Sequence, residues 1–191
     1  MNENDLESFK NQKLLIGVTG SIAVFSLPSY FVSFKQLFKE VAIVMTPSAE
    51  QFISATSFKN ICQYAYTDSS LNPTNHIELA RWPDRFIILP ATANTLFKSA
   101  YGQADNLLSL CILSYEKTIH FFPNMNLAMW NQKCVQRNIQ QLILDEHFVC
   151  PLNEQLAFEQ ASGTMKKNCV IPSVEQILFY LLTHPTKARL T

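Results

Sequence analysis

Short, uninterrupted runs of apolar residues recur along the chain. They cover residues 14–18, 41–45, 86–89, 119–122 and 148–149. Uninterrupted apolar runs are typical of strands that are buried on both faces, whereas strands with one exposed face alternate apolar and polar residues. The runs therefore predict a parallel sheet that is covered by helices on both sides.

Helical periodicity fills the intervals between these runs. Apolar residues spaced three and four apart form one stripe between the first two strands, at Leu27, Tyr30, Phe31, Phe34, Leu37 and Phe38. The order of strand, helix and strand predicts a βαβ unit. Further helices are expected over residues 95–115, 133–145 and 174–182.

This alternation predicts an α/β fold with a doubly wound, Rossmann-like (flavodoxin-like) parallel sheet. A single domain is expected over residues 13–191, because a chain of 191 residues can bury one core without further support. Residues 1–12 are polar and are expected to form a flexible N-terminal segment. The stretches 66–75 and 153–169 lack a clear period and are expected to be loose as well.

Composition excludes several classes of protein. With 48% hydrophobic and 16% charged residues, the chain is too apolar to be disordered. Fifteen basic residues balance fifteen acidic ones, so the basic excess of a nucleic-acid-binding protein is missing. No apolar run approaches the roughly 18 residues of a membrane span, and the five cysteines show no CxxC or zinc-ligand spacing. We expect a cytoplasmic protein without a metal site, a membrane span or a nucleic-acid partner.

Polar residues without charge follow four of the predicted strands. The first strand leads into residues 17–23, which hold two of the four glycines in the chain. Hydroxyl and amide side chains follow the next three strands, within 46–48, 90–95 and 123–130. Ligands of open parallel sheets bind beyond the carboxyl ends of the strands, and glycines there let backbone N–H groups approach a phosphate. The pattern predicts a neutral polar cradle for a phosphorylated aromatic ligand.

Each of these segments also has a simpler interpretation. Residues 17–23 are equally typical of an ordinary strand-to-helix turn, and Thr46, taken alone, is more typical of a helix cap. Neither the GxGxxG dinucleotide fingerprint nor a Walker lysine is present.

Three motifs carry a resemblance to a known family. They are NHIELARW at 75–82, PATANT at 90–95 and PNMNLAMW at 123–130. Together, in this order and at compatible spacings, they resemble the signatures of the homo-oligomeric flavin-containing cysteine decarboxylases. The Asn-Met-Asn version of the third motif and the short chain are similar to the peptidyl-cysteine decarboxylases that modify lantibiotic precursors, of the epidermin and mersacidin type. The resemblance implies that residues 13–191 form a flavin-binding decarboxylase domain.

The resemblance also implies a set of site residues. His76 matches the family's essential histidine, and Asn126 matches the asparagine that holds the substrate carboxylate, so both are expected to be catalytic. Asn126, Met129 and Ser162 are expected to bind the substrate. The cofactor is expected to be FMN, with FAD possible, bound where subunits meet. The expected cofactor-binding residues are Gly20, Ser21, Ile22, Thr46, Ser48, Thr92, Ala93, Asn94 and Thr95.

The implied reaction is a flavin-dependent oxidative decarboxylation of the C-terminal cysteine of a lantibiotic-type precursor peptide, which gives an enethiol. The implied partners are this peptide and further copies of the chain, in a homotrimer or homododecamer. Two alternatives stay open: a phosphopantothenoylcysteine decarboxylase of coenzyme A biosynthesis, and a non-catalytic flavin-binding regulatory protein.

Residues 161–163 bear on this choice. Coenzyme A pathway relatives use a cysteine in an Ala-Cys-Gly segment to reduce the enethiol, and this chain has Ser162 at that place. A serine hydroxyl is a far poorer acid than a thiol. Cys169 lies seven positions further on but is more simply interpreted as an incidental small residue. Among the histidines, His120 is expected in the core, and His147 and His184 are expected at the surface.

Overall fold

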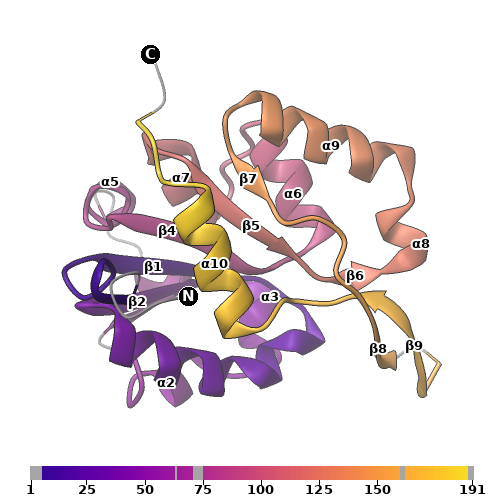
Figure 1. The fold of residues 1–191 in the computed structure, drawn as a ribbon, viewed down its shortest axis with the longest axis horizontal. Helices are drawn as coiled ribbons and strands as arrows, with labels where there is room; N and C mark the ends of the chain where they lie inside the picture. Colours follow the sequence, from indigo (N-terminus) through magenta and orange to yellow (C-terminus); the bar gives the residue numbers. More distant parts are fainter. Residues whose placement is uncertain (1–5, 63, 71–74, 160–161, 189–191) are drawn as a thin grey trace.

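A six-stranded parallel sheet forms the centre of the protein (Figure 1). The computed structural model describes residues 6–62, 64–70, 75–159 and 162–188. The strand order is β3-β2-β1-β4-β5-β7, which confirms the predicted doubly wound, Rossmann-like fold. The strands are β1 (Lys13–Val18), β2 (Glu40–Met45), β3 (Tyr64–Tyr66), β4 (Arg85–Ala91), β5 (Ile119–Pro123) and β7 (Phe148–Val149).

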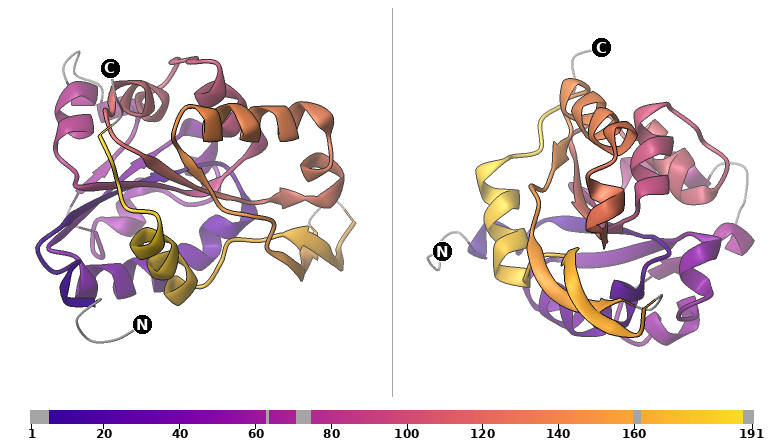
Figure 2. Two further views of the ribbon diagram at one scale, coloured as in Figure 1. Left: turned by 45° about the horizontal axis from the view of Figure 1, so that its top comes forward. Right: turned by 90° about the vertical axis from the view of Figure 1, so that its right-hand side faces the viewer.

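Helices cover both faces of this sheet (Figures 1 and 2). α2 (Leu27–Leu37) and α10 (Val174–Thr183) pack in the apolar layer that includes Leu14 and Ile16 of β1. Leu15 of the same strand belongs to the opposite layer. The helices of that layer are α5 (Asn75–Arg81), α6 (Ala93–Ala100), α7 (Leu107–Ser114) and α9 (Lys133–Leu144). Since successive residues of β1 face two apolar layers, residues 14–18 are all buried and carry no polar side chain.

Short elements follow the strands and lie near the carboxyl edge of the sheet. They are η1 (Ile22–Ser26), α3 (Pro47–Glu50), η2 (Asp68–Ser70), β6 (Met125–Asn126) and α8 (Leu127–Trp130). A further short helix, α4 (Ala55–Phe58), belongs to the crossover between β2 and β3. Within the described parts of the chain, the structure contains no helix with the length and apolar character needed to cross a membrane.

An antiparallel hairpin projects beyond this edge (Figure 2). Its strands β8 (Glu154–Glu159) and β9 (Thr164–Cys169) pair along their whole length, and β9 also pairs with β6. The prediction of a loose segment over residues 153–169 is therefore wrong. The strands are hard to recognise because charged and apolar residues do not alternate regularly, and the turn uses Gly163 at a φ of 64°.

Three smaller expectations also need correction. The stretch 95–115 forms two helices, α6 and α7, and the loop between them contains Gly102 at a φ of 65°. The segment 1–12 is not loose throughout, because Phe9 is fully buried against Phe38; residues 1–5 lie outside the described residues. His147 is buried rather than at the surface, and its Nδ1 accepts the backbone N–H of Ile119 at 3.1 Å.

His120 lies in the core, as predicted. Its side chain is fully buried in β5, and its Nε2 lies 2.7 Å from the carbonyl oxygen of His184. His184 follows α10, so this contact joins the sheet to the segment after the last helix. Nδ1 of His120 has no hydrogen-bond partner among the described residues.

Candidate active site

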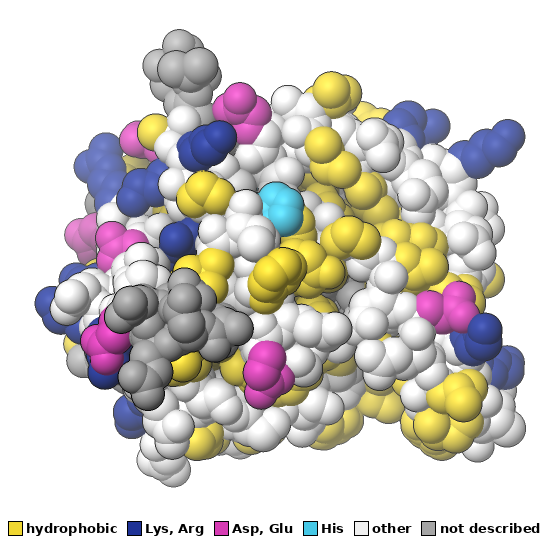
Figure 3. All heavy atoms as spheres, in the orientation of Figure 1, with side chains coloured by type: hydrophobic (Ala, Val, Ile, Leu, Met, Phe, Trp, Pro, Cys, Tyr) yellow, Lys and Arg dark blue, Asp and Glu magenta, His cyan; other side chains and the backbone are white. Residues whose placement is uncertain are grey.

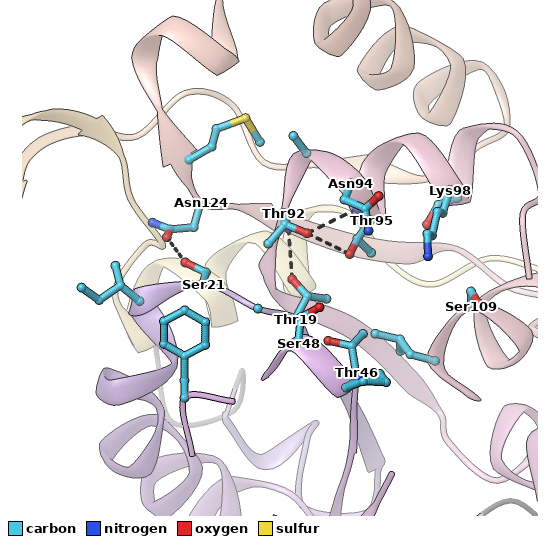
Figure 4. A pocket seen from close by; sticks show the side chains of 18 of the residues that line it. Thr19, Ser21, Thr46, Ser48, Thr92, Asn94, Thr95, Lys98, Ser109 and Asn124 are labelled. Carbon is cyan, nitrogen blue, oxygen red and sulfur yellow. Dashed lines mark hydrogen bonds between the residues drawn. The ribbon is translucent and has the colours of Figure 1, made fainter. Parts of the chain in front are cut away.

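A cavity of about 680 Å³ opens at the carboxyl ends of β1, β2, β4 and β5. The chain order of the sheet reverses at β1 and β4, and doubly wound sheets bind ligands at such a point. Most of the residues that the sequence analysis assigned to a ligand line this cavity (Figure 4). They are Gly20, Ser21, Ile22, Thr46, Ser48, Thr92, Ala93, Asn94, Thr95, Asn126 and Met129.

Several of these side chains also begin the helix that follows their strand. The Thr46 hydroxyl accepts the N–H of Ala49 at 3.2 Å, so its interpretation as a helix cap is confirmed. The same arrangement recurs at the other strand ends, where Ser21, Thr92 and Asn126 cap η1, α6 and α8. Capping places the polar side chain and the first backbone N–H groups of each element next to the cavity.

Gly20 allows the first two strand ends to lie against each other. A Cβ atom built on Gly20 would lie 2.6 Å from Cβ of Ser48 and 3.1 Å from its backbone carbonyl carbon and oxygen. No side chain fits between the two segments at this separation. The glycine therefore keeps the turn after β1 in contact with the start of α3, and both line the cavity.

Thr19 joins the ends of β1 and β4, a role that the sequence analysis missed. Its buried hydroxyl donates to the carbonyl oxygen of Pro90 at 2.7 Å and accepts the N–H of Thr92 at 3.1 Å. The residue lies within the polar segment 17–23, but its partners lie about 70 residues away at the end of β4, and no local sequence pattern marks such a long-range contact.

The amide of Asn126 is oriented by the start of α8. Its Oδ1 accepts the N–H of Met129 at 2.8 Å. This bond occupies the acceptor oxygen, so the Nδ2 group is the end of the amide that remains to donate hydrogen bonds. A side-chain N–H donor in the cavity is suited to a carboxylate.

Charged groups line the cavity as well, so the expected neutral cradle is only partly correct. Asp68, Lys98 and Asp105 contribute to the lining. Lys98 Nζ lies 2.7 Å from both carboxylate oxygens of Asp105, and this contact lowers the pKa of the Asp105 carboxyl. Asp68 accepts the N–H of Leu107 at 2.9 Å. The charges come from η2 and from α6 with its following loop, whereas the strand ends themselves are uncharged.

Two predicted site residues do not line the cavity that the described residues form. His76 is half-buried on α5. Ser162 is exposed at the hairpin turn, and its Oγ lies 2.8 Å from Oγ1 of Thr164.

Cys169 is unsuited to act as a proton donor in the cavity. Its side chain is buried at the base of the hairpin, and its thiol donates to the carbonyl oxygen of Pro123 at 3.5 Å. Burial raises the pKa of this thiol to about 11. Cys169 does not belong to the described lining of the cavity, which agrees with its interpretation as a packing residue.

The hairpin and Asn124 contribute to the lining without having been assigned a role from sequence. Ala157, Phe158 and Asn168 reach the cavity from β8 and β9. Asn124 lies in the third motif, two residues before Asn126, and the Ser21 hydroxyl donates to its Oδ1 (Figure 4). Asn124 is recognisable in the sequence as a polar residue of the third motif. Its contact with β9 is visible only in the folded structure.

A doubly wound sheet with a hydroxyl-rich cavity at its switch point is typical of a nucleotide-binding α/β protein. The model of the flavoprotein family matches residues 2–177, and the chain belongs to this family. It is 44% identical over 161 residues to the mersacidin decarboxylase of Bacillus sp. (strain HIL-Y85/54728), covering 83% of each chain. It is 37% identical over 173 residues to the epidermin decarboxylase of Staphylococcus epidermidis, covering 90% of this chain and 95% of that one.

Solved structures show the same similarity. A His-to-Asn variant of EpiD complexed with the substrate peptide DSYTC superposes with a TM-score of 0.84 at 36% identity, over 90% of this chain and 99% of that one. A Cys-to-Ser variant of PPC decarboxylase complexed with pantothenoylaminoethenethiol superposes with a TM-score of 0.79 at 29% identity, over 90% of this chain and 96% of that one.

The residues present fit a flavin mononucleotide. The cavity volume lies within the range of about 300–1,000 Å³ that is usual for ligand sites. The hydroxyls of Thr46, Ser48 and Thr95 suit a phosphate and a ribityl chain, whereas Ile22 and Phe52 offer apolar surface to an aromatic ring. The close contact of Gly20 with Ser48 leaves the backbone of the first turn accessible to such a ligand.

Proposed function

We propose that the protein is a flavin-dependent peptidyl-cysteine decarboxylase that converts the C-terminal cysteine of a lantibiotic-type precursor peptide into an enethiol. The observation that carries this proposal is the position of Asn126, whose amide donor shares one cavity with a cradle that fits FMN. The cavity can thereby hold a redox cofactor and a carboxylate together. The mersacidin and epidermin decarboxylases, to which the chain is similar, are named for this type of reaction.

The chemistry explains why a redox cofactor is needed. Direct loss of carbon dioxide from a C-terminal cysteine would leave an unstabilised carbanion at the α-carbon. A flavin held in the cavity would supply the hydride acceptor that oxidation at the β-carbon requires, so that the thiol could become a thioaldehyde. The electron pair of the breaking carbon–carboxylate bond then moves toward sulfur, so the peptide product is an enethiol. In total the peptide loses carbon dioxide and two hydrogens, and dioxygen reoxidises the reduced cofactor.

The chain's own residues bind and orient the reactants in this proposal. Gly20 to Ile22, Thr46, Ser48 and residues 92–95 hold the phosphate and the ribityl chain. Nδ2 of Asn126 donates to the substrate carboxylate, and the apolar side chain of Met129 beside it excludes water. Removing water from the carboxylate favours its departure as neutral carbon dioxide.

His76 is proposed to assist the deprotonation of the substrate thiol, since an imidazole nitrogen can accept the proton as a general base. It is not among the described residues that line the cavity of its own chain. We therefore infer that His76 acts in the cavity of a neighbouring subunit, and that the protein is a homotrimer or a homododecamer. Large hydrophobic side chains exposed on α9 and α10 support an assembly, including Ile143, Leu144 and Phe179. Figure 3 shows hydrophobic side chains gathered in a band between these two helices on one face of the molecule.

Ser162 supports the choice of an oxidative enzyme over a coenzyme A pathway decarboxylase. The PPC decarboxylase variant described above carries Ser in place of a Cys and holds an aminoethenethiol. This chain has Ser162 in its Ala-Ser-Gly segment. Without a thiol acid there, the reaction is expected to stop at the enethiol.

Incubation of the purified protein with FMN and a cysteine-terminated peptide, followed by mass spectrometry, tests the function. We expect the peptide to lose the mass of carbon dioxide plus two hydrogens, with consumption of oxygen. The same peptide with a C-terminal amide is the control, and it must stay unchanged because it has no carboxylate. Loss of carbon dioxide alone would contradict the oxidative reaction, and an unchanged acid peptide would contradict decarboxylation.

A further inference from the structure

Two parts of the chain that are distant in sequence line the same cavity. The turn after β1 contributes Gly20 and Ser21, and the hairpin contributes Ala157, Phe158 and Asn168. Among the described strands, β8 pairs with β9 alone, and β9 connects the hairpin to β6, outside the six-stranded sheet. The position of the hairpin over the cavity therefore depends on the contacts at its base.

Asn124 connects these two parts through one side chain. The hydroxyl of Ser21 donates to Oδ1 of Asn124, and Nδ2 of Asn124 donates to the carbonyl oxygen of Cys169 at 2.9 Å (Figure 4 shows the contact with Ser21). Cys169 is the last residue of β9 and pairs with both Met125 and Glu154, so it lies at the base of the hairpin. The amide of Asn124 thus touches the first turn on one side and the base of the hairpin on the other.

The orientation of this amide is determined by its partners. The carbonyl oxygen of Cys169 can only accept a hydrogen bond, so Nδ2 must face it, and Oδ1 is left for the Ser21 hydroxyl. The backbone N–H of Asn124 donates to the carbonyl oxygen of Ala91 at 3.0 Å, which holds the residue to the end of β4. The Cys169 thiol, which is neutral because burial raises its pKa to about 11, donates back to Pro123. The base of the hairpin is therefore bonded twice to residues 123–124.

We propose that Asn124 is a positioning residue that couples the flavin cradle to the hairpin wall of the cavity. A ligand that immobilises the turn at Ser21 also immobilises Oδ1 of Asn124, because the Ser21 hydroxyl donates to it. Nδ2 of the same amide then holds the carbonyl oxygen of Cys169, and with it β9. Flavin binding thereby orders the hairpin for the incoming peptide. Coupling of this kind is reciprocal, so a bound peptide also tightens the binding of flavin. The inference rests on the proposed function for the identity of the two ligands.

Hydrogen exchange of the backbone amides in β8 and β9, measured by mass spectrometry with and without FMN, tests the coupling. In the parent protein, FMN is expected to slow exchange in both strands. Asn124→Ala should still bind FMN, because the cradle residues are unchanged, but exchange in the hairpin should no longer respond to FMN. Asn153→Ala is the matched control. Its Nδ2 also donates to a carbonyl at the base of the hairpin, that of Val170 at 3.3 Å, but Asn153 does not belong to the described lining of the cavity.

Two further variants each break one of the two hydrogen bonds that connect Ser21 to Cys169 through Asn124. Asn124→Asp keeps an acceptor for Ser21 but has no donor for Cys169, and Ser21→Ala removes the hydroxyl. With each variant saturated with FMN, as its flavin spectrum verifies, both should lose the response of the hairpin to FMN, so the test does not depend on Asn124→Ala folding. In turnover, Asn124→Asp should raise KM for a cysteine-terminated peptide about five-fold or more, the lower end of usual coupling strengths, with kcat unchanged. Such a split indicates that the substitution weakens binding of the peptide and removes no catalytic group.

A parent hairpin that does not respond to FMN would overturn the inference, even if the enzyme decarboxylates peptide. The inference is also wrong if the three link-breaking variants respond like the parent, or if Asn153→Ala loses the response with them. A parent protein that binds no FMN would contradict the proposed function itself, and this result is distinguishable because it appears in the flavin spectrum before any exchange is measured.

Discussion

At the scale of single residues, the amide of Asn126 serves two purposes that substitutions can separate. Asn126→Asp keeps an oxygen to cap α8 but places a negative charge where the substrate carboxylate is proposed to bind. Asn126→Ala loses both the cap and the donor. We expect both variants to raise KM strongly, and only Asn126→Ala to lose about 1 kcal/mol of unfolding free energy. Denaturant titration and peptide kinetics measure the two effects. Parental kinetics in Asn126→Asp would contradict the assignment.

Gly20 is a second residue whose effect is predictable from geometry. Gly20→Ala would force the turn after β1 away from Ser48, because the added Cβ has a backbone neighbour that cannot rotate away. We expect FMN to bind at least about ten-fold more weakly, which corresponds to ~1.4 kcal/mol. Fluorescence titration of FMN measures this affinity.

The matched control for this variant is Gly102→Ala. Gly102 has a φ of 65° but is not among the described residues that line the main cavity. A methyl group there should lower the melting temperature and leave the affinity for FMN unchanged. Equal weakening of FMN binding in both variants would show that lost stability, and not the contact with Ser48, is responsible.

At the scale of secondary structure elements, the sequence predicted the strands better than the segments between them. β7 has the predicted bounds, and β1 and β2 begin one residue earlier than the apolar runs indicated. A strand buried on both faces needs an apolar residue at every position, and this leaves a clear signal. The hairpin leaves no such signal in the sequence, because its strands are held by pairing with each other and with β6 and do not require an apolar residue at every position. The break between α6 and α7 was missed because apolar residues continue on both sides of it.

The residues of the candidate site likewise divide into those at strand ends, which were predictable from sequence, and those that depend on the hairpin, which were not. Residues that line the cavity from strand ends were predictable, because strand ends meet at one edge of any parallel sheet. The link from Ser21 through Asn124 to Cys169 was not, because it depends on a hairpin that the sequence analysis treated as loose. His76 was assigned through the resemblance alone, and its role stays a prediction.

The hairpin also carries the prediction for Ser162. We expect Ser162→Cys to convert part of the enethiol into the reduced thiol product, because a thiol near pKa 8.5 can supply the proton that a hydroxyl cannot. Mass spectrometry distinguishes the products, since the reduced peptide has lost only carbon dioxide. Thr164→Cys is the matched control, because it places a thiol two residues away beside Ser162. Equal amounts of reduced product from both variants would contradict a specific role for position 162.

At the scale of the whole molecule, the proposed sharing of a site between subunits predicts complementation. As pure proteins, His76→Asn is expected to be inactive, and Asn126→Ala is expected to show little activity at peptide concentrations below its raised KM. Co-expressed with different purification tags, they should form mixed oligomers in which some cavities combine an intact His76 from one subunit with an intact Asn126 from another. Mixed oligomers should therefore recover part of the parental activity. If doubly purified mixed oligomers stay inactive, or if the parent is a monomer by light scattering, the shared site is wrong.

The buried imidazole of His120 makes the stability of the molecule sensitive to acid. Burial lowers the pKa of His120 from 6.5 to about 4, with Arg85 and His184 as the neighbouring charged or titratable groups. Between these two values the unfolded chain binds a proton that the folded chain does not, so stability falls as the pH falls from about 6.5 to about 4. The loss approaches ~3 kcal/mol at the lower end. Replacing the imidazole with a ring that cannot titrate, in His120→Phe, should flatten the unfolding free energy over this interval in urea titrations at several pH values. An unchanged slope would show that other groups cause the acid loss. This acid sensitivity is unrelated to catalysis: Nε2 of His120 already donates to the carbonyl oxygen of His184, so the added proton would go to Nδ1, which has no hydrogen-bond partner among the described residues and would carry its charge into the apolar core.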